Sequence, residues 1–99
     1  YCPMTYQVIW TNAAFDDLLE IEEFIGQPKA DRIIESIMSR SRQLSQFPEI
    51  GAIQEMPSHR RVYRFIVEDN YKIIYSFERS IVQICAVFDS RRDPKNLKL

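Results

Sequence analysis

The sequence lacks the features of a membrane, secreted or metal-binding protein. No apolar run approaches the roughly 20 residues that a membrane helix needs, and no basic stretch followed by an apolar one marks a signal peptide. If the natural start is Met4, Cys85 is the only native cysteine and cannot form an internal disulfide, which indicates a reducing, cytoplasmic setting. The single histidine, His59, belongs to no cluster with metal-ligand spacing. We therefore expect no metal, no cofactor and no membrane partner.

The length and composition predict one soluble globular domain. The chain has 99 residues, of which 45% are hydrophobic and 27% charged, as is usual for an ordered domain. We place this domain at residues 4–99 and interpret residues 1–3 as an added segment.

The net charge of −1 conceals an uneven distribution. Residues 1–57 carry four Lys/Arg and nine Asp/Glu, whereas residues 58–99 carry nine Lys/Arg and five Asp/Glu. The C-terminal part is therefore expected to meet a negatively charged partner, although two solvated faces of opposite sign would give the same pattern.

The N-terminal half predicts a strand followed by two helices. The β-branched and aromatic residues of 6–10 indicate a strand. A helix is expected over about 13–25, with Asn12 as N-cap, Asp16 and Asp17 in the first turn, and Gly26 ending it in a left-handed conformation. A second helix begins near Pro28 and ends before residue 48, and its buried stripe is expected at Ala30, Ile34, Ile37, Ser41 and Leu44. The short link between them predicts an antiparallel hairpin.

The C-terminal half predicts a β-meander. Residues 48–58 contain two prolines and a glycine and indicate a loop. Strands are expected over 62–67, 71–77 and 81–88, separated by two short turns, which implies antiparallel pairing. Together these elements define an α+β fold in which the helices pack on one face of the sheet.

Alternation of side chains along each strand predicts which residues face solvent. If the larger apolar sets cover the helices, the 82, 84, 86 and 88 side chains point inward. The opposite, open face then carries Arg64, Lys72, Gln83 and Asp89, and Arg91 and Arg92 follow at its end. The aromatic residues are mostly assigned to the core: Tyr63, Phe65, Tyr71, Tyr75 and Phe77. A single bulge would reverse the assignment for a strand.

The order of these features resembles the RelE/ParE toxins of bacterial type II toxin–antitoxin systems. The resemblance covers nearly all of residues 4–97. It is carried by the 6–10 strand with Ala14 and Leu18, by Phe47-Pro48 with Gly51, by Arg64, by the 70–75 run and by the 87–94 segment.

This resemblance implies a toxin neutralised by a cognate antitoxin, with a role in plasmid stabilisation or growth inhibition. RelE-like members cut messenger RNA on the translating ribosome, and ParE-like members poison DNA gyrase. A third possibility is a relative that only binds antitoxin. Fold alone does not choose between these activities.

Cleavage of RNA by 2′-hydroxyl attack needs a base, an acid and cations. The candidate catalytic residues are Arg64, Lys72, Asp89 and Arg91. The candidate target- or nucleic-acid-binding residues are Arg60, Arg61, Arg64, Lys72, Arg91 and Arg92.

The acid and the base are harder to find than the cations. Cleaving relatives often have a histidine where this chain has Asp89, which neighbouring arginines should keep ionised and ion-paired. His59 and Glu55 lie on a loop and are weaker candidates, and Cys85 is expected to be a packing residue. The missing acid favours the ParE-like interpretation.

Overall fold

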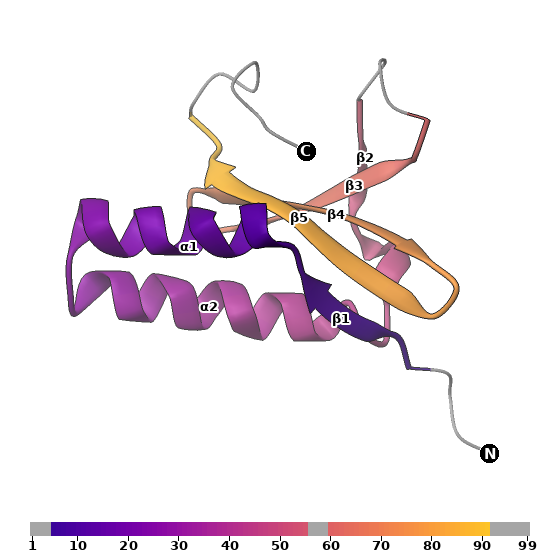
Figure 1. Cartoon of the computed structure of the whole chain (residues 1–99), viewed down its shortest axis with the longest axis horizontal. Coiled ribbons are helices and arrows are strands. Elements are labelled where there is room, and N and C mark those ends of the chain that lie inside the picture. Colours follow the sequence, from indigo (N-terminus) through magenta and orange to yellow (C-terminus); the bar gives the residue numbers. More distant parts are fainter. Residues whose placement is uncertain (1–4, 56–59, 92–99) are drawn as a thin grey trace.

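The computed structural model describes residues 5–55 and 60–91. Figure 1 shows two antiparallel helices side by side against a twisted sheet, which confirms the α+β class. None of the described helices is long and apolar enough to cross a membrane. The elements in chain order are β1 (Gln7–Trp10), α1 (Asn12–Ile25), α2 (Lys29–Gln43), the 3-10 helix η1 (Pro48–Ile50), β2 (Ala52–Gln54), β3 (Tyr63–Glu68), β4 (Tyr71–Glu78) and β5 (Ile81–Asp89).

The sheet has five strands in the order β1-β5-β4-β3-β2. The meander of β3, β4 and β5 is antiparallel as predicted, and β1 pairs with β5 in parallel. The assignment of 48–58 to a loop was wrong within its described part, because this part contains η1 and the edge strand β2, which pairs with β3. A three-residue strand is too short for alternation to reveal it.

The start of α1 differs from the prediction by one residue. Thr11, not Asn12, is the N-cap, and its hydroxyl accepts a hydrogen bond from the Ala14 amide at 3.1 Å. The Thr11 amide also donates to the Ile84 carbonyl at 3.1 Å, so the helix begins where the chain leaves the sheet. No acid lies in the first turn of α1, which corrects the placement of Asp16 and Asp17.

Gly26 ends α1 as predicted but not in the left-handed helical conformation, whereas the stripe of α2 follows the predicted pattern. Gly26 follows α1 with a φ of 80°, which glycine adopts at little cost, although its ψ of 160° is extended rather than left-handed helical. The predicted stripe of α2 is buried at Ala30, Ile37, Ser41 and Leu44.

One hydrophobic core lies between the helices and one face of the sheet, here called the helix face. Cross-strand neighbours share a face, so the register assigns the side chains of every strand. The core is formed by Ala14, Leu18, Ile21, Ile37, Leu44, Ile66, Ile73, Tyr75, Val82, Ile84 and Val87.

A β-bulge in β5 exchanges the two faces halfway along the strand. Ile74 pairs with Ala86, but Tyr75 pairs with Ile84, so Cys85 is an extra residue. Val82 and Ile84 therefore point to the helices as predicted, whereas beyond the bulge Val87 does so. Ala86 and Phe88, which pair with Ile74 and Lys72, lie on the opposite, open face, and the prediction for them was wrong.

Thr11 and the N-terminal part of α1 form hydrogen bonds with the backbone of β5 beyond the point where β1 ends. Pairing of β1 with β5 ends at Ile84. From there the Thr11 hydroxyl donates to the Cys85 carbonyl at 3.4 Å, and the Asp17 carboxylate accepts from the Val87 amide at 2.9 Å. Beyond the end of β1, this edge of β5 is thus hydrogen-bonded by side chains instead of by the backbone of a neighbouring strand.

Removal of the Asp17 carboxylate should destabilise the fold. Asp17→Ala leaves the Val87 amide without its partner, and we expect a loss of about 1–3 kcal/mol in the free energy of unfolding. Asp17→Asn retains an acceptor oxygen and should lose less. Asp16→Ala is the matched control, because Asp16 is exposed, and it should change stability by less than about 0.5 kcal/mol. Urea unfolding measures all three, and equal effects of Asp17→Ala and Asp16→Ala would contradict the assigned role.

The stability of the wild type should also respond to acid through Asp17. Burial raises the pKa of Asp17 above its ordinary value of 3.8, more than the Val87 amide lowers it. Between 3.8 and the folded pKa the folded chain binds more protons than the unfolded chain. The contribution of Asp17 to stability therefore rises as pH falls through this window and is constant below it. The wild type should gain stability relative to Asp17→Asn between pH 7 and pH 4, and a relative loss would refute the assignment.

Candidate functional site

Arg64 lies on the helix face, contrary to the prediction that it shares the open face. It pairs across β3–β4 with Tyr75, a core residue. Its guanidinium donates to the Gly51 carbonyl at 2.8 Å and to the Glu49 carbonyl at 3.4 Å, and lies 5.8 Å from the centre of the Phe77 ring. These contacts tie Arg64 to the turn before β2, which gives it a structural role.

The same turn is held by the buried hydroxyl of Tyr75. This hydroxyl donates to the Pro48 carbonyl at 2.6 Å and accepts from the Gly51 amide at 2.9 Å. Burial raises the pKa of Tyr75, which keeps the phenol protonated. Gly51 must lack a side chain, because a Cβ there would lie 2.5 Å from the Tyr75 hydroxyl and 2.7 Å from the Phe65 carbonyl oxygen.

Lys72 lies on the open face, as predicted, and it lies over an aromatic ring. Its ammonium nitrogen is 3.9 Å from the centre of the Phe65 ring. Phe65 pairs with Ile74, so it belongs to the open face as well. The assignment of Phe65 and Tyr63 to the core was wrong, because alternation from core residue Ile66 places both on the other face. Phe65 and Lys72 thus form a cationic and aromatic surface of the kind that contacts charged partners.

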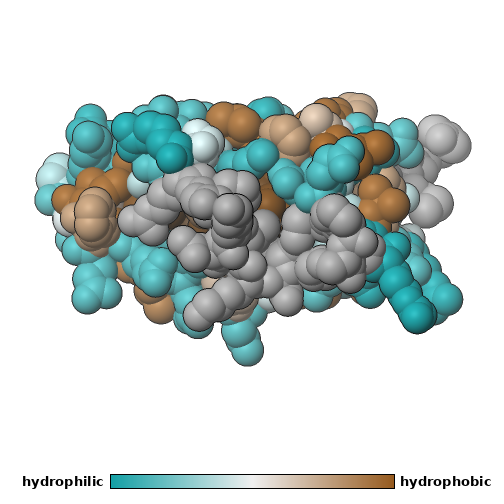
Figure 2. Space-filling view, turned by 90° about the horizontal axis from the view of Figure 1, so that it is seen from above, coloured by the Kyte–Doolittle hydropathy of each residue, from teal (hydrophilic) through white to brown (hydrophobic). Residues whose placement is uncertain are grey.

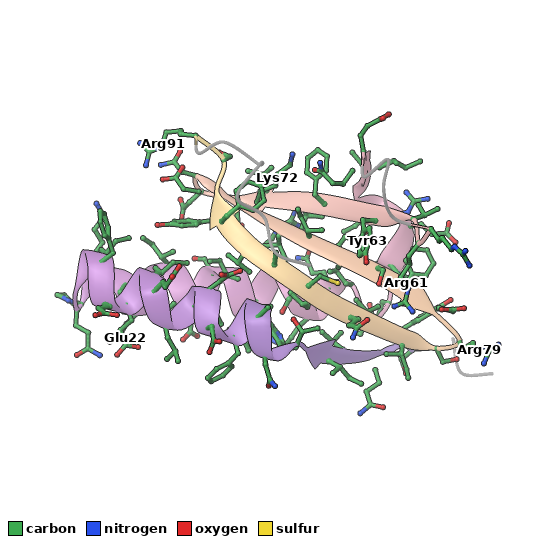
Figure 3. The ribbon with its side chains drawn as sticks, turned by 45° about the horizontal axis from the view of Figure 1, so that its top comes forward. Glu22, Arg61, Tyr63, Lys72, Arg79 and Arg91 are labelled. Carbon is green, nitrogen blue, oxygen red and sulfur yellow. The ribbon has the colours of Figure 1, made fainter. Side chains whose placement is uncertain are left out.

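A second basic position lies at the other end of the open face. Arg61 donates to the Gln83 side chain at 3.0 Å and lies 3.9 Å from the Glu78 carboxylate. Gln83 is on the open face, as predicted, since it pairs with Ser76. Figure 3 shows Arg61 near the β4–β5 turn that carries Arg79. A cavity of about 260 Å³ is lined here by Ile9, Arg61, Ser76, Phe77, Glu78, Ile81 and Gln83.

Asp89 and Arg91 form a close ion pair at the end of β5. The Arg91 guanidinium donates to both Asp89 oxygens, at 3.0 and 2.7 Å, and the Arg91 amide donates at 2.9 Å. The predicted ion pair is confirmed, and its hydrogen bonds raise the pKa of Arg91. Asp89 pairs with Tyr71, which packs against the core, so the prediction that Asp89 lies on the open face was wrong. Figure 3 shows Arg91 at the opposite end of the sheet from Arg61.

The other sequence candidates contribute no described acid–base pair. His59 and Arg92 lie outside the described residues. Arg60 and Glu55 are described and exposed. Cys85 is buried, and burial raises the pKa of its thiol, as expected for a packing residue rather than a nucleophile. Residues 5–55 and 60–91 contain no group of three or more His, Cys, Asp or Glu able to hold a metal ion.

The four candidate catalytic residues therefore occupy three places. Lys72 is on the open face, Arg64 is bound to the turn on the helix face, and Asp89 with Arg91 forms the pair at the end of β5. In the described strands the open face offers one carboxylate, Glu78, which lies 3.9 Å from Arg61. This arrangement suits binding through charge and aromatic contact better than proton transfer, which needs an acid and a base on opposite sides of one substrate.

Sequence reasoning missed the supporting residues Thr11, Asp17 and Phe65. The hydroxyl of Thr11 was a possible signal, because threonine directly before a helical pattern is a good N-cap. For Asp17 no local signal existed, since its partner lies 70 residues away in the chain. The face on which Phe65 lies could not be predicted, because both faces of the sheet are apolar near its centre. Ile74 and Ala86 on the open face are as buried as the core residues.

The family model for the ParE toxin of the type II toxin–antitoxin system parDE matches residues 8–94. The chain belongs to the ParE toxin family.

Two solved structures share the fold. A chain of the chromosomal ParDE toxin–antitoxin system from P. aeruginosa is 21% identical, with a TM-score of 0.72 over 87% of this chain and 97% of that one. A chain of the RelBE2 toxin–antitoxin complex from Mycobacterium tuberculosis is 20% identical, with a TM-score of 0.65 over 87% of this chain and 92% of that one. No curated protein sequence matches the chain.

Loss of the Tyr75 hydroxyl should loosen the turn that holds Arg64. Tyr75→Phe leaves the Gly51 amide and the Pro48 carbonyl without their partner, and we expect a cost of about 1–3 kcal/mol in the free energy of unfolding. Tyr6→Phe is the control, because the described contact of Tyr6 is its ring against Phe77, and it should change little. Thermal unfolding measures the difference, and equal stability of the two variants would exclude Tyr75 as the anchor of the turn.

Proposed function

We propose that the chain is the toxin of a bacterial type II toxin–antitoxin pair, held inactive in the cytoplasm by a cognate antitoxin. Family membership and the fold shared with chains of ParDE and RelBE2 assemblies support this proposal. Stabilisation of plasmids through growth inhibition is the role that such a pair would serve.

We further propose that the target is DNA gyrase rather than ribosome-bound messenger RNA. One observation carries this choice: Lys72, Arg64 and the Asp89–Arg91 pair lie in three separate places and do not surround one reacting phosphate. A binding inhibitor needs complementary charge and shape, and does not need an acid and a base in contact with one substrate.

The second candidate is a RelE-like endonuclease. It is favoured by the likeness to a chain of the RelBE2 complex and by the presence of Lys72 and Arg61 on one face. There they could balance the charge of an RNA phosphate. The third, an inactive relative that only binds antitoxin, would leave growth unaffected.

Three outcomes of expression without antitoxin separate these candidates. The purified protein is expected to inhibit supercoiling by gyrase and to leave messenger RNA on translating ribosomes intact, and cells are expected to show a DNA-damage response. Codon-positioned cuts in messages with normal supercoiling would support the endonuclease instead. Undisturbed growth at high expression would support the inactive relative.

Charge reversal on the open face should abolish toxicity without unfolding the protein. Each well-formed contact of Lys72 or Arg61 with the target contributes roughly 1.5–3 kcal/mol, so Arg61→Glu/Lys72→Glu should lose growth inhibition. Lys29→Glu/Arg32→Glu is the control of equal charge change, since both residues are exposed on α2. Circular dichroism checks folding and colony counts measure toxicity. A folded double variant of full toxicity would show that these residues form only solvated surface.

A further inference from the structure

The turn between β4 and β5 has a backbone conformation that its residues do not favour. Glu78 pairs with Ile81, so the turn consists of Arg79 and Ser80, whose φ angles are 51° and 69°. Positive φ at both central residues is the mark of a type I′ turn, which prefers asparagine and glycine. For arginine and serine this conformation costs stability, because the side chain crowds the backbone. In the β3–β4 turn, by contrast, the positive φ of 55° falls on Asp69, a residue type that tolerates it.

Arg79 has no ion pair that would offset this cost in the part of the chain that the structure describes. The neighbouring carboxylate, Glu78, lies 3.9 Å from Arg61, and Arg79 is exposed. The turn is nevertheless held in place, because the Gln7 amide at the start of β1 donates to the Ser80 carbonyl at 2.9 Å. A costly conformation that fixes an arginine at an exposed position indicates that the arginine is used in a contact outside the chain.

A hollow next to the turn combines apolar and basic side chains. It has a volume of about 260 Å³, and its lining includes Arg61, Gln83, Ile9 and Ile81. The two isoleucines are 39% and 41% exposed, and Arg61 is positioned by its hydrogen bond of 3.0 Å to Gln83. Pockets for drug-sized ligands hold about 300–1,000 Å³, so this smaller hollow suits a single side chain of a partner.

The charge around the hollow fits a protein better than a nucleic acid. Figure 3 shows Arg61 and Arg79 at the same end of the sheet. On the right of Figure 2, which is this end, apolar side chains lie beside strongly hydrophilic ones. Glu78 also lines the hollow, so the turn and the lining together carry two cations and one carboxylate. Interfaces with nucleic acid are much more positively charged, whereas an apolar pocket flanked by arginine is typical of a binding hot spot for protein.

We propose that this end of the sheet, here called the turn site and formed by Arg61, Arg79 and the hollow, binds an acidic segment of the target protein. One apolar side chain of the segment would enter the hollow between Ile9 and Ile81, and its carboxylates would pair with the two arginines. Because β1 holds the turn, little backbone freedom is lost when Arg79 binds. The inference rests on the proposed function, which supplies a protein as the target.

Replacement of the turn by its preferred residues separates binding from folding. Arg79→Asn/Ser80→Gly should raise the melting temperature by roughly 4–8 °C, because the strain is relieved. The same variant should weaken inhibition of gyrase supercoiling about tenfold or more, because a charged contact is lost. A stabilised variant that inhibits gyrase as strongly as the wild type would overturn the proposal.

Two matched variants isolate the arginine. Ser80→Gly relieves part of the strain but keeps Arg79, and it should inhibit gyrase within about twofold of the wild type. Arg32→Gln removes one exposed cation from α2 and should also stay within about twofold. Equal weakening by Ser80→Gly and by the double variant would assign the effect to the turn backbone and refute a contact of Arg79.

A titration with peptides tests the turn site without gyrase. The probe is a short peptide with one leucine between pairs of aspartates, and NMR of the isotope-labelled wild-type chain follows the backbone amides. The amides of Ile9, Arg79, Ile81 and Gln83 should shift with this peptide and not with its lysine counterpart. Alanine in place of leucine should weaken binding about tenfold, because the apolar contact is lost. Equally strong shifts with a single-stranded oligothymidylate would overturn the proposal in favour of nucleic acid.

Failure of the turn site and failure of the proposed function have different signatures. A chain that inhibits gyrase and growth, but whose turn-site amides do not respond to the aspartate peptide, refutes the turn site only. A chain that binds the peptide at these amides, loses this binding in Arg79→Asn/Ser80→Gly, and leaves gyrase and growth unaffected refutes the proposed target and leaves the turn site.

Discussion

The extra residue at Cys85 decides which side chains of β5 meet the helices and which form the open face. Before it, Val82 and Ile84 enter the core; after it, Val87 does. A bulge leaves backbone groups without their ladder partners, and these groups need other hydrogen bonds. Here the Thr11 hydroxyl and the Asp17 carboxylate provide them. The bulge therefore sets the composition of the open face, and the contact of α1 with β5 satisfies the strand edge beside it.

A second buried contact fixes the other side of the sheet. The Tyr75 hydroxyl bridges Pro48 and Gly51, and the carbonyl of Gly51 accepts from Arg64. The Nη1 nitrogen of Arg64 donates to both the Gly51 and the Glu49 carbonyls, and turning the guanidinium toward a phosphate on the open face would leave these carbonyls without this donor. Among residues 60–91, Lys72 and Arg61 are the cations with contacts on the open face, and their separation favours a broad interface over a compact catalytic centre.

Local patterns were sufficient for most elements, because their signals lie within a few residues. The stripe of α2, the hairpin turns and the Asp89–Arg91 pair are all of this kind. The faces of the strands were not predictable, since period-two alternation carries no information on a bulge. The rule that the more apolar set faces the core also failed in β3. Phe65 and Val67 outweigh Ile66 in number, yet they lie on a sheet that is apolar on both sides.

In the structure the acidic excess of the N-terminal half is concentrated on α1, since α2 carries four Lys or Arg and two acids. Helix α1 is purely acidic, whereas Arg61, Lys72 and Arg91 lie on or beside the strands. Surfaces of opposite charge select different partners. On the proposed function, a negatively charged target surface is attracted by Arg61 and Lys72 on the open face and repelled by the acids of α1, so the charge distribution favours an approach from the side of the sheet.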